Sequence, residues 1–161
     1  SAKVVIFDDD NYYLGSAIAE KLGRLGYKTV LVTSQGRISD WSGYTAEQDA
    51  VQKNLIQLGV ELRTSNSVSA LGSDYVELSC VYSGKREQLG CDIFVPVTSR
   101  EPSDQLWIDL KGRGLQTLCR VGDCSAPGII AQAVYDGHRA AREFGQANSP
   151  LPRRERVIIK R

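Results

Sequence analysis

Three consecutive carboxylates follow directly on an apolar run near the start of the chain. Residues 3–7 have the pattern of a buried parallel strand, and Asp8, Asp9 and Asp10 come next. In a dinucleotide-binding βαβ unit this place carries G-x-G-x-x-G, whose glycines let the pyrophosphate approach the helix N-terminus. Only the last glycine, Gly15, is present here, and it suits close packing of the helix on the strand but not the approach of a phosphate. Because three carboxylates would repel a dianionic pyrophosphate, the sequence predicts a nucleotide turn that has lost its phosphate site.

The acidic triplet has other interpretations. Three carboxylates could hold a hard cation such as Mg²⁺, but no phosphate-transfer motif accompanies them. A phosphoaccepting aspartate would need a suitably spaced lysine, and the later strand ends offer Thr98 instead. The favoured interpretation is that these acids cap the following helix, in a loop that no longer binds a nucleotide.

The end of the second strand gives a further nucleotide signal. Thr33, Ser34 and Gln35 stand where an Asp or Glu would bind a ribose 2′-hydroxyl. Arg37 follows and could meet a 2′-phosphate instead. An alternative hypothesis is therefore an active NAD(P)H-binding module that uses Gly15, the N-terminus of the first helix and Arg37.

Hydrophobic spacing predicts the elements that position these residues. The first helix carries Ile18, Leu22 and Leu25 and ends at Gly26. A capping box of Thr45 and Gln48 opens the second helix. The remaining predicted elements are strands at 28–33, 60–63 and 92–97, an antiparallel hairpin or meander within 66–97, a helical stretch at 104–110, a strand near 115–121 and an Ala-rich helix at about 127–143.

This order predicts an α/β fold, a Rossmann-like three-layer nucleotide-binding domain with a central parallel sheet and an antiparallel β insert. At 161 residues, with 42% hydrophobic and 24% charged residues, the chain suits one compact globular domain. The order alone suggests only a class, because such folds host many functions.

Charge and composition limit the partners. The net charge is +1, which argues against nucleic acid or an anionic membrane. Residues 145–161 form a basic tail in which five bases stand against Glu155. The absence of a long apolar run and of a signal-peptide pattern predicts a cytoplasmic protein. The four cysteines show no C-x-x-C spacing, so no metal site is expected. The chain has no Met and begins Ser1-Ala2, which suggests a piece of a longer polypeptide.

Two stretches resemble the trimethylamine dehydrogenase family, which includes dimethylamine and histamine dehydrogenases and, more distantly, 2,4-dienoyl-CoA reductase. The resemblance covers roughly residues 3–144. The first stretch is Asp10-Asn11-Tyr12-Tyr13-Leu14-Gly15 leading into Ala17-Ile18-Ala19-Glu20-Lys21-Leu22. The second is Val121-Gly122-Asp123 followed by Ala126-Pro127-Gly128-Ile129-Ile130-Ala131 and by residues 135–143.

The resemblance implies a C-terminal FAD/NAD(P)-binding-like domain of an iron-sulfur flavoprotein. Complete family members carry an FMN-binding barrel and a 4Fe-4S cluster, and neither is found in this sequence. The implied modules are an NAD(P)-binding-like part at 1–114, a closing strand and helix of an FAD/ADP-binding-like part at 115–144, and the tail at 145–161. In members that hold FAD or ADP, the residues matching Gly122, Asp123 and Gly128 lie at the ligand's hydroxyls and phosphates. For Asp123 the simpler interpretation is a helix cap.

Three functional hypotheses follow. The leading one is a structural or ADP-related segment of an oxidoreductase that is not catalytic alone, whose partners are the remaining parent domains and an electron-transfer flavoprotein. The second is the active NAD(P)H module delivering hydride to a flavin. The third is a non-enzymatic interaction domain that docks through an aromatic loop of Tyr12, Tyr13, Trp41 and Tyr44 and through the basic tail, although packing is the simpler role of these rings. No catalytic residue is assigned, since His138 is the only histidine and has no partner in sequence.

Overall fold

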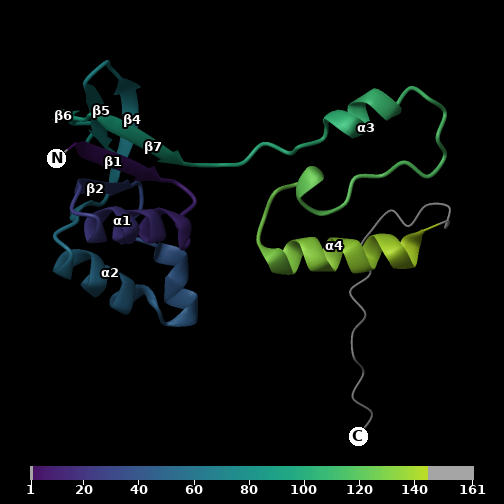
Figure 1. The fold of residues 1–161 in the computed structure, drawn as a ribbon, viewed down its shortest axis with the longest axis horizontal. Coiled ribbons are helices and arrows are strands. Elements are labelled where there is room, and N and C mark those ends of the chain that lie inside the picture. The colour runs from purple at the N-terminus through teal and green to yellow at the C-terminus, as the bar shows by residue number, and fades with distance from the viewer. Residues whose placement is uncertain (1, 145–161) are drawn as a thin grey trace, which may run out of the picture. The chain divides into compact units, whose positions relative to one another are not determined.

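A computed structural model describes residues 2–144 of the chain (Figure 1). The chain divides into two compact units, residues 1–99 and residues 100–161, and each is described by itself. The module boundary expected after residue 114 stays a prediction. The basic tail predicted at 145–161 lies outside the described residues.

A four-stranded parallel sheet forms the centre of unit 1. Its strands are β1 (Lys3–Asp8), β2 (Lys28–Thr33), β3 (Glu61–Arg63) and β7 (Ile93–Val97), in the order β3-β2-β1-β7. The β-branched and apolar residues of β1 and β2 favour central strands that are buried on both faces, whereas the edge strands β3 and β7 are more exposed. The sequence predicted all four strands to within one residue.

Two helices cover one face of this sheet, as Figure 1 shows. They are α1 (Leu14–Arg24) and α2 (Gln48–Gln57), and a short 3-10 helix, η1 (Asp40–Thr45), precedes α2. The core on this side consists of Val4, Ile6, Ala19, Leu31, Ile38, Leu55, Val60 and Val97. The capping box predicted for α2 is wrong, because the N-cap is Glu47 and the Thr45 hydroxyl instead donates to the Ser42 carbonyl and to the Glu47 carboxylate.

An antiparallel sheet covers the other face (Figure 1). It consists of β4 (Asn66–Leu71), β5 (Tyr75–Cys80) and β6 (Arg86–Gly90) in sequential order. The second core lies between the two sheets and contains Val5, Val30, Val32, Val76, Leu78 and Leu89. Helices, parallel sheet and antiparallel insert thus form three layers, and the predicted fold class is confirmed.

Unit 2 has a different organisation. It contains α3 (Gln105–Leu110), the 3-10 turn η2 (Gly122–Cys124) and α4 (Ile130–Glu143). The strand predicted at 115–121 is wrong for the described chain, because a strand needs a hydrogen-bonded neighbour and residues 100–144 contain no other strand. None of the helices in residues 2–144 is long and apolar enough to span a membrane.

In the first half of unit 2, two cationic side chains lie over the ring of Trp107. The Arg120 guanidinium lies 4.5 Å from the Trp107 ring centroid, and the Lys111 Nζ lies 4.8 Å from it. Arg120 also forms an ion pair with Asp104. These cation–π contacts and this ion pair link α3 to the segment that leads into η2.

Candidate nucleotide-binding site

The turn between β1 and α1 lies where the order in which strands are added to the sheet reverses. Because β2 and β7 flank β1 on opposite sides, the chain leaves β1 at the topological switch point, the place where open α/β sheets bind ligands. The backbone N–H groups of Asp9 and Asp10 both donate to the Val97 carbonyl, at 2.8 and 3.2 Å. The turn is therefore tied to the end of β7.

Asp8 is the buried member of the acidic triplet. Its side chain is fully shielded from solvent, and its Oδ1 accepts a hydrogen bond from the Asn11 N–H at 3.0 Å. Its Oδ2 is buried without a hydrogen-bond partner. Burial, reinforced by the charges of Asp10 and Asp9, raises the pKa of Asp8 to about 6. This carboxyl group therefore holds its proton far more tightly than an exposed aspartate.

Gly15 lies in the first turn of α1, directly against Asp8. A Cβ at this position would stand 2.5 Å from the Asp8 Cγ, which is closer than real Cβ contacts. The missing side chain thus makes room for a carboxyl group of the protein itself. Gly15 thus lets α1 pack closely against Asp8 at the end of β1, as expected of the last glycine of the motif.

Asn11 is a site residue that the sequence analysis missed. It has φ of +58°, a conformation that asparagine tolerates better than most residues. Its Oδ1 accepts from the Thr33 hydroxyl at 2.8 Å, and its Nδ2 donates to the Asp9 carbonyl at 2.9 Å. Its own carbonyl accepts from the Trp41 N–H at 3.0 Å. Asn11 therefore links the ends of β1 and β2 to η1, and its position between acids and aromatic residues gave no distinct sequence signal.

The acids do not cap α1. The N-cap of this helix is Tyr13, which makes no side-chain capping bond, and the first turn contains no acidic residue. The favoured interpretation of the triplet as helix caps is therefore wrong. Asp8 instead accepts a hydrogen bond from the backbone N–H of Asn11, within the loop that precedes α1. No group of His, Cys, Asp or Glu side chains among the described residues is arranged to hold a metal ion.

Arg37 lies in the loop after β2, at the same edge of the sheet. Its Nε and Nη2 contact the Asp40 Oδ1 at 3.0 and 2.9 Å, and both side chains are largely exposed. The expected 2′-phosphate contact would thus compete with an existing ion pair. No direct contact between Arg37 and Gly15 is found in the described chain.

In unit 2 the structure brings the three predicted residues together. Gly122 is buried with φ of +66°, and a Cβ there would lie 3.6 Å from the Ala133 Cβ on α4. The Asp123 Oδ1 accepts from the Gly128 N–H at 3.3 Å. Asp123 does not cap α4, whose N-cap is Ile129, so it closes the loop before the helix.

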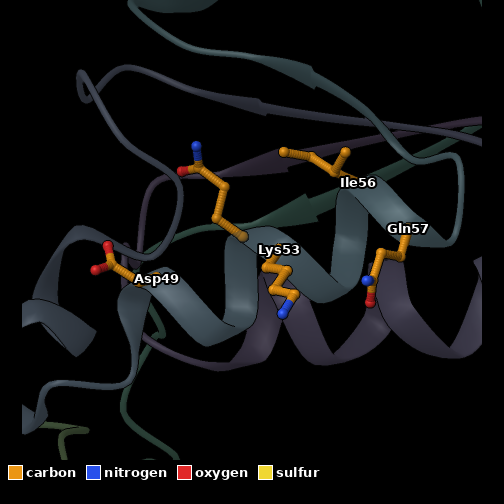
Figure 2. Close-up of a pocket in the computed structure, with 5 residues that line it drawn as sticks. Asp49, Lys53, Ile56 and Gln57 are labelled. Atoms are coloured by element: carbon orange, nitrogen blue, oxygen red, sulfur yellow. The ribbon is translucent and has the colours of Figure 1, made fainter.

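A shallow depression on α2 lies elsewhere on unit 1 (Figure 2). All its lining residues belong to this one helix: Asp49, Gln52, Lys53, Ile56 and Gln57. It contains none of the candidate residues. The candidate nucleotide-binding residues lie instead at the carboxyl edge of the parallel sheet and in the η2–α4 loop.

A parallel sheet of this order, with helices on one face and an antiparallel layer on the other, defines a nucleotide-binding fold of the flavoprotein type. No protein-family model matches the sequence. Comparison with individual proteins identifies relatives of the chain. The chain is 30% identical to dimethylamine dehydrogenase of Hyphomicrobium sp. (strain x), over 96% of this chain and 25% of that protein.

Two solved structures are also similar to the chain in sequence and in fold. Histamine dehydrogenase from Rhizobium sp. 4-9 is 42% identical, with a TM-score of 0.88 over 92% of this chain and 24% of that one. The 6-hydroxypseudooxynicotine amine oxidase from Pseudomonas geniculata N1 is 31% identical, with a TM-score of 0.84 over 89% of this chain and 22% of that one. The chain is thus a homologue of the trimethylamine dehydrogenase family, and it spans about a quarter of the length of these relatives.

Proposed function

We propose that the chain is a segment of an amine dehydrogenase-like oxidoreductase in which unit 1 is structural and does not receive NAD(P)H. The observation that carries this proposal is that Asp10 and Tyr12 stand at the positions of the first two glycines, of which the second lets a pyrophosphate approach the backbone. Gly15, the glycine that packs the helix against the strand in such folds, lies here against the buried carboxyl group of Asp8. The chemistry of amine oxidation belongs, on this proposal, to the rest of the parent enzyme.

The backbone donors of the turn support the same proposal. Phosphates at such a turn are held by N–H groups that point at the ligand. Here the N–H groups of Asp9 and Asp10 donate to Val97, and that of Asn11 donates to Asp8. Three successive donors are thus already used, and the carboxylates of Asp9 and Asp10 add repulsion. The residues of this turn do not fit a pyrophosphate.

The η2–α4 loop fits an ADP-related role better. Asp123 is exposed and uses its Oδ1 for Gly128, so the same carboxylate offers its Oδ2 as an acceptor for a sugar hydroxyl. Gly122 and Gly128 carry no side chain that would block an approach. An ADP or FAD held by the parent enzyme would therefore meet this segment at Gly122, Asp123 and Gly128. When bound, FAD would supply redox chemistry, whereas ADP would be structural.

The resemblance also bears on the parent enzyme. It implies an FMN and a 4Fe-4S cluster in the remaining domains, which would pass electrons from an amine to an electron-transfer flavoprotein. A segment in such an electron path does not need NAD(P)H. The loss of a phosphate-binding turn in unit 1 is consistent with that role.

Calorimetric and thermal-shift titrations with ADP, NADH, NADPH and FAD test the proposal. A ligand at 100 times its Kd adds about 2.7 kcal/mol to the free energy of unfolding, which a thermal shift detects. We expect no saturable binding of NADH or NADPH. We expect any ADP binding to be lost in Asp123→Ala and kept in Asp109→Ala, which removes another exposed acid of unit 2.

A gain-of-function variant sharpens the test. In G-x-G-x-x-G ending at Gly15, the first two glycines fall at Asp10 and Tyr12. Asp10→Gly combined with Tyr12→Gly should therefore increase affinity for a dinucleotide. Saturable NADPH binding by the unaltered chain that disappears in Arg37→Ala would overturn the proposal and support the active NAD(P)H module.

A further inference from the structure

Four aromatic side chains lie at the carboxyl edge of the parallel sheet, and we call them the aromatic face: Tyr12, Tyr13, Trp41 and Tyr44. Tyr12 and Tyr13 form an edge-to-face pair with ring centroids 5.2 Å apart, and Trp41 and Tyr44 form a tilted pair at the same distance. The hydrogen bond from the Trp41 backbone N–H to the Asn11 carbonyl holds the two loops beside each other. Tyr13, Trp41 and Tyr44 are 61%, 59% and 83% exposed.

The loop that carries Trp41 and Tyr44 is firmly held although its rings are exposed. The Gln48 Nε2 donates to the Ile38 carbonyl at 3.0 Å, and the Ser42 hydroxyl donates to the Ser39 carbonyl at 2.7 Å. Ser39 and Ala46, at the two ends of η1, have φ of +51° and +60°. Rings presented by an ordered loop lose little conformational entropy when a partner binds.

The surroundings of the aromatic face are acidic. Residues 8–13 and 37–49 contain five acids that reach the surface, Asp9, Asp10, Asp40, Glu47 and Asp49, against one base, Arg37, whereas Asp8 is buried. Arg37 is paired with Asp40. A partner that complements this surface therefore carries cations.

The chain's other tryptophan shows how cations bind such a ring. Trp107 in unit 2 carries the Arg120 guanidinium at 4.5 Å and the Lys111 Nζ at 4.8 Å from its centroid, and Arg120 also pairs with the Asp104 carboxylate. In the described residues no cation lies over Trp41. Guanidinium groups stack flat on exposed Trp and Tyr rings and pair with carboxylates at the same time, whereas an ammonium does so less well.

We propose that the aromatic face is a docking surface for a separate protein that presents arginine side chains. The exposed rings give the contact area, as Trp, Tyr and Arg do at the centres of protein interfaces. The acidic rim orients the partner and speeds its approach. This role goes beyond the proposed structural function of unit 1, because it needs no nucleotide.

Trp41 fluorescence in the full chain tests the proposal. Trp107→Phe leaves Trp41 as the single tryptophan, and the probe is an octa-arginine peptide titrated at low salt, with octa-lysine in parallel. We expect saturable binding that is tighter for octa-arginine and that weakens about tenfold in the double variant Tyr13→Ala, Tyr44→Ala. The matched control is Tyr82→Ala, because Tyr82 is an 84% exposed ring on the turn after β5.

Each other outcome contradicts the proposal. Equal affinity for octa-lysine and octa-arginine, or equal loss in Tyr82→Ala, would reduce the effect to general charge attraction. Absence of saturable binding would remove the docking surface altogether. A chain that elutes as a dimer in size-exclusion chromatography and becomes monomeric in Trp41→Ala would assign the face to a second copy. Circular dichroism confirms that the variants, which alter exposed rings only, remain folded.

Discussion

Helices α1 and α4 are both amphipathic, yet only α1 buries its apolar side. In α1, Ala19 is fully buried, and Ile18 and Leu22 pack against the core of unit 1. In α4 no residue is buried, and Ile130 and Val134 are 84% and 54% exposed. The spacing of apolar residues therefore specifies a helix and its apolar side, but a sheet has to be present before that side contributes to stability.

The same contrast extends to the two units. Unit 1 places two apolar clusters on the two faces of one sheet, whereas in the described part of unit 2 Gly122 is the only buried residue. Each unit contains one tryptophan, Trp41 in unit 1 and Trp107 in unit 2. The variants Trp107→Phe and Trp41→Phe thus give separate fluorescence signals for the unfolding of unit 1 and unit 2.

The largest expected difference comes from truncating one apolar side chain in each unit. Leu31 is fully buried in β2, so Leu31→Ala should lower the free energy of unfolding of unit 1 by about 2–5 kcal/mol. Val134→Ala in α4 should change unit 2 by less than about 0.5 kcal/mol, because the side chain is exposed. Urea titrations with the two tryptophan signals measure both. A cost above 2 kcal/mol for Val134→Ala would show that unit 2 has a core of its own.

Asp8 gives unit 1 a pH dependence. Because the pKa of Asp8 is about 6 in the folded chain against 3.8 ordinarily, the folded state binds the proton more tightly. Its contribution to stability is therefore complete below about pH 4 and is lost as the pH rises through 6. Asp8→Asn cannot ionise and keeps an acceptor for the Asn11 N–H.

We expect Asp8→Asn to be more stable than the parent chain at pH 8, by up to about 3 kcal/mol, and equal to it below pH 4. Urea titrations from pH 4 to 8, read from Trp41, measure this difference. Asp74→Asn serves as the control, because Asp74 is exposed and is not among the groups that shift the pKa of Asp8. A variant less stable than the parent at pH 8 would mean that the ionised carboxylate has a favourable partner.

A third comparison places an alanine in each helix. Gly15→Ala should destabilise unit 1 by about 1–3 kcal/mol, because the new Cβ would meet the Asp8 Cγ. Gly137→Ala meets no atom within 4 Å and should stabilise α4 by up to about 1 kcal/mol. Thermal unfolding followed by circular dichroism and by the two tryptophans checks both signs. If Gly15→Ala were neutral, α1 would not be packed closely against Asp8 at the end of β1.

The sequence predicted what depends on local patterns. Strands such as residues 28–33 and the end of α1 before Gly26 follow from apolar runs and from a glycine with positive φ. The burial of Asp8 and the bridging role of Asn11 could not be predicted, because both depend on residues distant in sequence. Asp8 lies beside Val97 of β7, and Asn11 bonds to Thr33 of β2 and to Trp41. The strand expected at 115–121 failed for the same reason, since its formation depends on a neighbour.

The smallest expected effects come from one exposed ion pair in each unit. On its solvent side α1 carries the pair Glu20–Arg24 and α4 carries Arg139–Glu143, with shortest N–O distances of 2.8 and 3.3 Å. Glu20→Gln should cost about 0.3–0.5 kcal/mol, and 1 M salt should remove this cost. Glu143→Gln should cost less, because the basic residue precedes the acid in this pair and because an acid at the C-terminus of α4 opposes the helix dipole. A cost of more than 1 kcal/mol for Glu143→Gln would mean that ion pairs rather than apolar contacts hold unit 2 together. Small costs in both units would leave apolar burial as the property in which α1 and α4 differ.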